Sequence, residues 1–92
     1  MTDLSGKVIV VTGAGGNLGG CMASVLAARN ARLVLSDINE TATARRRDEI
    51  RSQGGQAVAH VTDVTKEGDL RSLMDFAVGE YGGIDVSSIM PA

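Results

Sequence analysis

Glycines cluster near the start of the chain in a pattern suited to holding a phosphate group. The run KVIVVTGAGGNLGG, residues 7–20, begins as an apolar strand pattern, breaks at Gly13, Gly15 and Gly16, and resumes as a helical pattern at Leu18. Glycines in such a turn let backbone amides approach a ligand closely, and the N-terminus of the following helix favours an anion. The run therefore predicts a site for the pyrophosphate of a dinucleotide.

A carboxylate stands where the adenosine ribose of such a ligand would lie. Asp37 follows Gly19 by eighteen residues at the end of a second apolar strand pattern, and its side chain can accept hydrogen bonds from both ribose hydroxyls. A 2′-phosphate would meet a like charge there, which favours NAD over NADP, although Arg45–Arg47 would soften the repulsion if their helix turned them inward. The alternative role for Asp37 is a turn or N-cap ahead of residues 39–43.

Three further residues have side chains that could do chemistry. Asp63 ends the segment HVTDVT, where its carboxylate would accept from the adenine amine or would cap the following helix, and both interpretations stay open. His60 has no second His, Cys or carboxylate at metal-ligand spacing, which indicates a half-exposed strand residue. Cys21 lies near a helix N-terminus, which can lower a thiol pKa, but its place on an apolar stripe favours a small core residue. The sequence thus predicts no metal site.

The elements that must position these residues alternate between strand and helix patterns. Strands are expected at residues 8–11, 32–36, 56–61 and from 84 to 86, and helices from Leu18 to about 30, from 39 to about 53, and from a Thr65 cap to Gly82 and Gly83. Short connections between alternating elements favour an α/β fold with a parallel sheet in the order 3-2-1-4. Residues 1–92 are expected to form a single, partial dinucleotide-binding domain.

Two of the expected helices have distinct faces. In the first, Leu18, Cys21, Met22, Val25 and Leu26 fall at helical spacing. In the second, the apolar positions reduce mainly to Ile38, Ala42 and Ile50, and Arg45–Arg47 read as a solvated basic face, with a phosphate-binding triplet as the alternative.

Composition excludes several classes of protein. The 92 residues carry a net charge of −2, which provides no field for attracting nucleic acid or an anionic membrane. The single Cys21 cannot form an internal disulfide, and neither a signal peptide nor a membrane-spanning apolar run is present, so we expect a cytoplasmic protein. With only Phe76 and Tyr81 as aromatic residues, the core is expected to be aliphatic and light.

Four motifs together resemble the short-chain dehydrogenase/reductase family. They are TGAGGNLG at residues 12–19, Asp37, Asp63-Val64, and Gly83-Ile84-Asp85-Val86. The resemblance implies a Rossmann-like, doubly wound fold and an NAD(P)-dependent oxidoreductase. It implies that the cofactor-binding residues are Gly13, Gly15, Gly16, Asn17, Leu18, Gly19, Asp37, Asp63 and Val64.

The chain departs from the family pattern at two places. Asn17 stands where the pattern TGxxxGxG has glycine, but Asn tolerates positive φ, and the pattern TGxxGxxG of the longer-chain branch fits without exception. After Val86 the chain reads SSIMPA, where the family has Asn-Asn-Ala-Gly and later a catalytic Ser and a Tyr-x-x-x-Lys pair. Tyr81 is followed four residues later by Asp85 rather than Lys, and Ser87 and Ser88 have no base beside them, so no catalytic residue is predicted.

Because the catalytic residues of the family do not follow the fourth expected strand, we expect limited activity and an exposed sheet edge. The chain would bind NAD or ADP-ribose weakly and transfer no hydride alone, because the proton donor is absent. An apolar fourth strand without a fifth neighbour would expose a sheet edge that recruits another chain. The sequence therefore predicts marginal folding or self-association, or, in a non-enzymatic alternative, pairing with a full-length relative. The substrate cannot be inferred.

Overall fold

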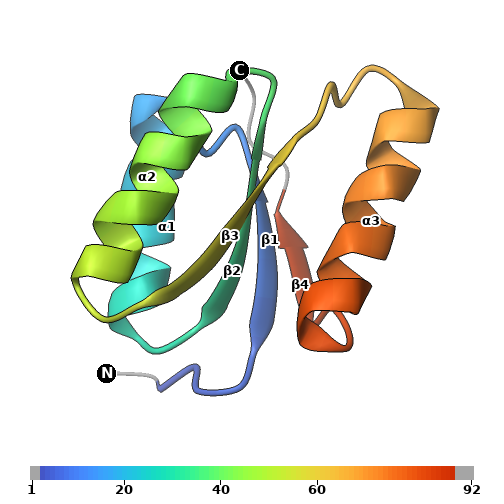
Figure 1. Cartoon of the computed structure of the whole chain (residues 1–92). Coiled ribbons are helices and arrows are strands. Elements are labelled where there is room, and N and C mark those ends of the chain that lie inside the picture. Colours follow the sequence, from blue (N-terminus) through green and yellow to red (C-terminus); the bar gives the residue numbers. More distant parts are fainter. Residues whose placement is uncertain (1–2, 89–92) are drawn as a thin grey trace.

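The chain folds as three layers, with a parallel sheet between helices. The computed structural model describes residues 3–88. The elements are β1 (Val8–Thr12), α1 (Asn17–Ala28), β2 (Arg32–Asp37), α2 (Glu40–Ser52), β3 (Gln56–Val61), α3 (Glu67–Tyr81) and β4 (Val86–Ser88). Helices α1 and α2 cover one face of the sheet and α3 covers the other (Figure 1). This arrangement confirms the predicted alternation of elements.

The four described strands form one sheet in the order β3-β2-β1-β4, with every pair parallel. This is the order predicted from the sequence. Val10 of β1 pairs with Val34 of β2, which pairs with Val58 of β3. Because parallel strands end at one edge, this register brings the ends of β1, β2 and β3 together at the same edge of the sheet.

The core is aliphatic, as predicted, and lies on both faces of the sheet. On the α1 and α2 face the larger buried side chains are those of Ile9, Val11, Leu33, Leu35 and Ile50. On the α3 face the cluster consists of Val8, Val10, Val34, Leu73 and Ala77. Alternate residues of β1 and β2 therefore enter opposite cores, which explains why both strands are apolar throughout.

Helix α1 presents a different face to the sheet from the one its apolar pattern indicates. The buried residues of α1 are Gly19, Gly20 and Ala23. Leu18 and Val25 are 67% and 52% exposed, and Cys21 is exposed as well. The prediction that Cys21 is a core residue was wrong, because the backbone of α1 lies so close to its neighbours that only small residues fit beneath it.

The ends of α2 and α3 are set by different devices. Asn39 caps α2, its side-chain oxygen accepting a hydrogen bond from the Ala42 amide at 3.0 Å. Helix α3 begins after Lys66, which makes no side-chain cap, so the predicted Thr65 cap was wrong. At the other end Gly82 adopts φ 82°, and its amide donates to the Val78 carbonyl, as a C-terminal glycine is expected to do.

Strand β4 begins at Val86, two residues later than the pattern from Ile84 predicted. Ile84 packs against the α3-side core instead. Asp85 joins this segment to β1 twice: its Oδ2 accepts from the Val8 amide at 2.8 Å, and its own amide donates to the Val8 carbonyl at 2.9 Å. Residues 89–92, the end of the segment SSIMPA, lie outside the described residues.

Candidate functional site

The glycine-rich loop connects β1 to α1 at the carboxyl edge of the sheet. Gly13 has φ 71°, a conformation that favours glycine, and its carbonyl accepts from the Gly16 amide at 3.0 Å. Gly16 is the N-cap of α1 and has no side-chain capping bond. The first amides of α1 therefore donate to no capping side chain. Such a helix N-terminus suits an anionic ligand.

Two close approaches in this loop depend on the absence of a side chain. A Cβ at Gly19 would collide with the Gly13 carbonyl oxygen and lie 2.7 Å from the Gly13 carbonyl carbon. A Cβ at Gly15 would lie 2.9 Å from Oδ2 of Asp37 and 3.0 Å from Cβ of Ala42. The loop therefore folds back on the first turn of α1 and touches the end of β2.

Asn17 is the first residue of α1, not a positive-φ residue of the turn. The helix therefore starts one residue before Leu18, and the tolerance of Asn for left-handed backbone is not used here. Among the described non-glycine residues only Asn30, after α1, has positive φ, at 72°. Replacing glycine by Asn at position 17 is accommodated because a helical residue needs no special conformation.

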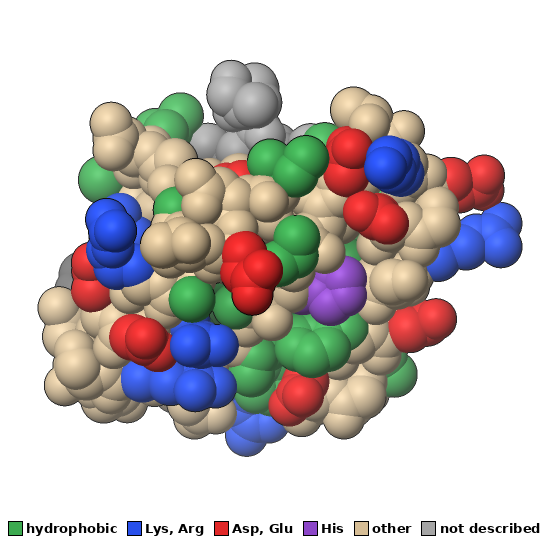
Figure 2. Space-filling model, turned by 45° about the horizontal axis from the view of Figure 1, so that its top comes forward, with side chains coloured by type: hydrophobic (Ala, Val, Ile, Leu, Met, Phe, Trp, Pro, Cys, Tyr) green, Lys and Arg blue, Asp and Glu red, His purple; other side chains and the backbone are tan. Residues whose placement is uncertain are grey.

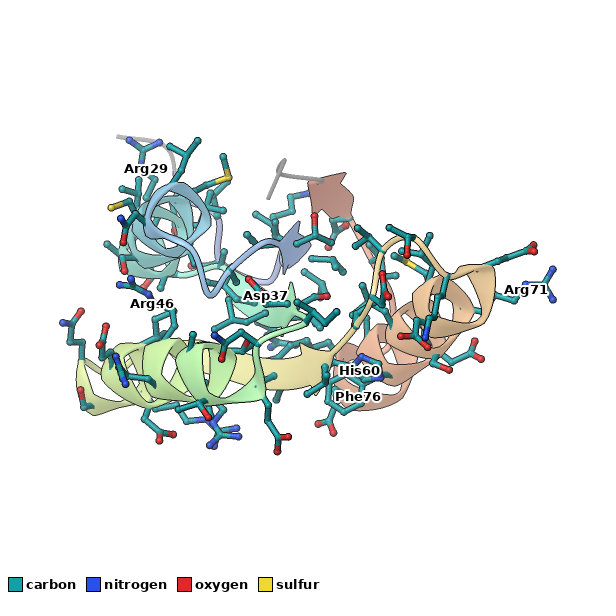
Figure 3. The ribbon with its side chains drawn as sticks, turned by 90° about the horizontal axis from the view of Figure 1, so that it is seen from above. Arg29, Asp37, Arg46, His60, Arg71 and Phe76 are labelled. Atoms are coloured by element: carbon teal, nitrogen blue, oxygen red, sulfur yellow. The ribbon has the colours of Figure 1, made fainter. Side chains whose placement is uncertain are left out.

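Asp37, at the end of β2, contacts the glycine loop directly. Its Oδ2 accepts a hydrogen bond from the Gly15 amide at 2.9 Å, and its Oδ1 accepts from the Asn39 amide at 3.0 Å. Figure 3 shows Asp37 seen from above, between the α1 and α2 layer and the sheet. The structure therefore brings Asp37 and the glycine loop together. The N-cap of α2 is Asn39 and not Asp37.

The end of β3 contributes a second carboxylate and apolar surface. Asp63 accepts from the Thr65 amide at 3.0 Å and from the Thr65 hydroxyl at 2.6 Å, so its side chain forms the turn that leads to α3. Val61 and Val64 are 48% and 42% exposed. The Thr62 amide donates to the Asp37 carbonyl at 3.0 Å, which holds this turn beside the end of β2.

Ile38 is a candidate that the sequence reasoning placed differently. The sequence pattern places it among the apolar positions of the second helix, but it precedes α2 and is 67% exposed. An apolar residue directly after the strand-end Asp37 was the available signal. Ile38, Val61 and Val64 are exposed apolar residues at or just after the ends of β2 and β3, and we call them the strand-end rim.

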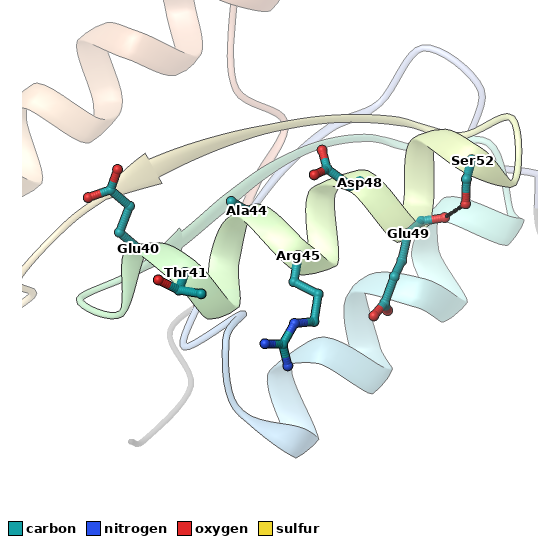
Figure 4. A pocket seen from close by; sticks show the side chains of 7 residues that line it. All are labelled: Glu40, Thr41, Ala44, Arg45, Asp48, Glu49 and Ser52. Carbon is teal, nitrogen blue, oxygen red and sulfur yellow. Dashed lines mark hydrogen bonds between the residues drawn. The ribbon is translucent and has the colours of Figure 1, made fainter.

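The consecutive arginines Arg45, Arg46 and Arg47 of α2 do not form a phosphate site. Arg46 lies between α1 and α2 (Figure 3), against the backbone of Gly20, and pairs with Glu49 at 3.2 Å. Arg47 pairs with Asp48 at 3.0 Å. Arg45 lines a shallow depression on the outer face of α2 whose other charged lining residues are the acids Glu40, Asp48 and Glu49 (Figure 4). This acidic surface does not suit an anion.

His60 packs in a manner consistent with a strand residue rather than a base. Its Nδ1 lies 2.7 Å from the Thr62 hydroxyl, and its ring centroid lies 5.0 Å from that of Phe76 on α3. The single histidine, purple in Figure 2, is visible at the surface beside hydrophobic side chains. Its half-exposed position was predicted.

Asp63 and Tyr81 have displaced pKa values. The Thr65 hydroxyl, and then the Thr65 amide, hold the pKa of Asp63 below its ordinary value. Burial raises the pKa of Tyr81, whose hydroxyl donates to the Leu33 carbonyl at 3.4 Å. Neither shift involves the glycine loop.

Two features are absent from the described residues. No group of three or more His, Cys, Asp or Glu side chains is arranged to hold a metal ion within residues 3–88. In the same part of the chain, no helix has the length and apolar character needed to cross a membrane.

The fold and the loop geometry define the class of Rossmann-like nucleotide-binding folds, and comparison with known proteins gives the family. The family model for short chain dehydrogenase matches residues 7–87. This chain belongs to the short-chain dehydrogenase/reductase family. Members of this family bind NAD(P) cofactors.

Individual relatives agree with this assignment. The chain is 42% identical over 83 residues to a 7alpha-hydroxysteroid dehydrogenase of Escherichia coli strain K12, covering 90% of this chain and 32% of that protein. A solved hydroxysteroid dehydrogenase from Escherichia coli superposes with a TM-score of 0.93 at 40% identity, covering 95% of this chain and 37% of the other. A family member from Burkholderia phymatum, solved in complex with NAD, gives a TM-score of 0.89 at 34% identity, with coverages of 95% and 31%.

The chain spans about a third of the length of the curated relatives it matches. What it covers is the N-terminal, NAD-binding region of the family. No Tyr-x-x-x-Lys pair occurs in the 92 residues, since Tyr81 is the single tyrosine and Asp85 lies four residues after it.

Proposed function

We propose that this chain provides the adenosine and pyrophosphate half of an NAD site in an oxidoreductase. The observation that carries the proposal is the contact between Asp37 and the glycine loop, at 2.9 Å from the Gly15 amide. It puts a carboxylate beside a helix N-terminus that has no side-chain cap. A ribose bound through its hydroxyls to Asp37 would leave its pyrophosphate next to the first turn of α1.

Each predicted residue has a role in this proposal. Gly13, Gly15, Gly16 and Gly19 shape the loop, Asn17 and Leu18 offer amides to the pyrophosphate, and Asp37 accepts from the ribose. Asp63 and Val64 would contact the adenine, with Val64 as part of the strand-end rim. The three strands that lead to these residues, β1, β2 and β3, end at one edge of the sheet, as a bound dinucleotide requires.

The choice of NAD over NADP rests on charge. The carboxylate of Asp37 would repel a 2′-phosphate, and the nearby arginines Arg46 and Arg47 are paired with acids, so they are poorly placed to compensate. Residues 1–92 then act as a single, partial dinucleotide-binding domain in the cytoplasm. Hydride transfer would need a proton donor from elsewhere, and we propose that these residues alone transfer no hydride.

Isothermal titration calorimetry with NAD, NADP and AMP tests this proposal. We expect saturable binding of NAD and AMP, weaker binding of NADP, and loss of the NAD preference in Asp37→Ala. Absence of saturable NAD binding, or an NADP preference that persists in Asp37→Ala, would contradict the assignment of the loop and of Asp37.

A second candidate is a module that pairs with another chain through β4. Among the described strands β4 pairs only with β1, so its other edge carries unpaired backbone groups. The exposed side chains of Leu18, Cys21 and Val25 add apolar surface on α1. We propose homo-oligomers, or complexes with a full-length relative, as the outcome of this exposure.

Sedimentation and pull-down distinguish the second candidate from the first. Concentration-dependent association, or capture of a full-length relative, would support pairing. A stable monomer with a cooperative melt that captures no relative would rule it out.

A further inference from the structure

We propose that Asp37 is a positioning residue for the glycine loop, in addition to being the ribose acceptor of the proposed NAD site on which this inference rests. The contact concerned is the hydrogen bond from the Gly15 amide to Oδ2 of Asp37, at 2.9 Å, which we call the Gly15 anchor. A single carboxylate would then fix the pyrophosphate loop and bind the ribose.

The anchor ties the loop to the end of β2 at a point where no side chain intervenes. A Cβ at Gly15 would lie 2.9 Å from Asp37 Oδ2 and 3.0 Å from Ala42 Cβ, so the backbone itself is in contact with the carboxylate. The other Asp37 oxygen accepts from the Asn39 amide at 3.0 Å. Asp37 therefore bridges the glycine loop and the segment that starts α2.

The neighbouring residue makes a second, independent attachment. The Ala14 amide donates to the Ser36 carbonyl at 3.1 Å, and this bond does not involve the Asp37 side chain. Ala14 is thus an internal reference for any experiment that removes the anchor. Loss of the anchor alone should free Gly15 and Gly16 while Ala14 stays in place.

The anchor and ribose binding are compatible. An ionised carboxylate has about four lone-pair positions, of which the Gly15 and Asn39 amides occupy two. The remaining two suffice for two ribose hydroxyls. It follows that substituting Asp37 to admit a 2′-phosphate also releases the loop that holds the pyrophosphate, so a single substitution would weaken binding of both cofactors.

The direction in which pyrophosphate affinity changes on removal of Asp37 separates a positioning role from ribose binding alone. Inorganic pyrophosphate has no ribose, and removing the negative charge at position 37 should by itself strengthen its binding. If Asp37 holds the loop, its removal should instead weaken pyrophosphate binding, because the amides lose their orientation.

The first test is amide hydrogen exchange by NMR on the 92-residue chain without ligand. In Asp37→Ala we expect the Gly15 amide to exchange about tenfold faster, the effect of losing a hydrogen bond to a charged group, with Ala14 unchanged. In Asp48→Ala, which removes the same charge from the outer face of α2, neither amide should change. Unchanged Gly15 exchange in Asp37→Ala would overturn the anchor.

The second test is pyrophosphate titration of the same proteins. We expect about tenfold weaker binding in Asp37→Ala, partial recovery in Asp37→Asn, which keeps one acceptor oxygen, and wild-type affinity in Asp48→Ala. Equal or tighter binding in Asp37→Ala would overturn the positioning role. If the wild-type chain binds neither pyrophosphate nor NAD, the proposed function fails, whereas the anchor is still decided by the exchange of Gly15.

Discussion

Replacing Gly19 by alanine should damage the glycine loop even though alanine favours helices. A Cβ at Gly19 would collide with the Gly13 carbonyl oxygen and lie 2.7 Å from its carbon and 3.2 Å from the Ala14 amide nitrogen. These are backbone atoms of the loop, which cannot rotate away as a side chain would. The helix or the loop must therefore shift.

The expected magnitude combines two opposing effects. Overpacking against fixed atoms typically costs about 1–3 kcal/mol, whereas Gly to Ala in a helix interior contributes up to about 1 kcal/mol of stability. We expect Gly19→Ala to lower the free energy of unfolding by about 1 kcal/mol. Because Gly13 would be displaced, we also expect NAD affinity to fall about tenfold or more.

Two other helical glycines are matched controls. A Cβ at Gly79 of α3 meets no atom within 4 Å, so Gly79→Ala should raise the free energy of unfolding by about 0.5–1 kcal/mol. At Gly20 the added Cβ would meet the Arg46 guanidinium, the end of a flexible side chain, so the effect should lie between the other two.

Urea denaturation of the three variants, together with NAD titration, measures both effects. The comparison requires an unchanged m value, so that shifts of the midpoint report stability. If Gly19→Ala matched Gly79→Ala in stability and bound NAD as the wild type does, the close approach of the loop to α1 would be wrong.

Three further outcomes follow from particular contacts. Asp85→Ala should lower the free energy of unfolding by about 1 kcal/mol, because the Val8 amide loses its acceptor, and denaturation of Asp48→Ala should show a smaller change. Burial raises the pKa of Tyr81 above 10.0, so folding favours the neutral form of its hydroxyl. The free energy of unfolding should therefore fall as pH rises through the raised pKa. Absorbance titration and a pH series of melts should show this loss of stability in the wild type and not in Tyr81→Phe. In Thr65→Val the pKa of Asp63 should rise toward its ordinary 3.8, since the hydroxyl that lowers it is gone; an unchanged NMR titration of that carboxyl would refute the contact.

The sequence predicted the topology well because strand patterns and glycines mark the element ends independently of packing. The bounds of β3 at Gln56–Val61 and the C-terminal glycine of α3 at Gly82 are confirmed. So is the sheet order, which depends on short connections between alternating elements.

The errors arose where tertiary contacts overrule local pattern. The helical stripe of α1 indicated that Cys21 is buried, yet close approach of the Gly13 carbonyl to Gly19 and of Arg46 to Gly20 turns the smallest residues inward. Thr65 suits an N-cap, but its amide and hydroxyl both bind Asp63, so α3 starts after Lys66. The spacing of residues along the chain does not predict these tertiary contacts.

The Gly15 anchor likewise could not be predicted from the sequence. The register between glycine loop and β2 predicted that Asp37 lies near the loop, and the structure agrees with that placement. Whether a carboxylate reaches a particular amide depends on distances of a few tenths of an ångström, which follow from the packing of α1 and α2 on the sheet.

Mapping NAD binding by NMR tests the central claim most directly. Titration of NAD into the 92-residue chain should produce its largest amide shifts at residues 13–19 and at Asp37, with smaller shifts at Asp63 and Val64 and none on the outer face of α2. Saturable shifts centred on α2, or none in the glycine loop at saturating NAD, would contradict the proposal that this loop and Asp37 form the dinucleotide site.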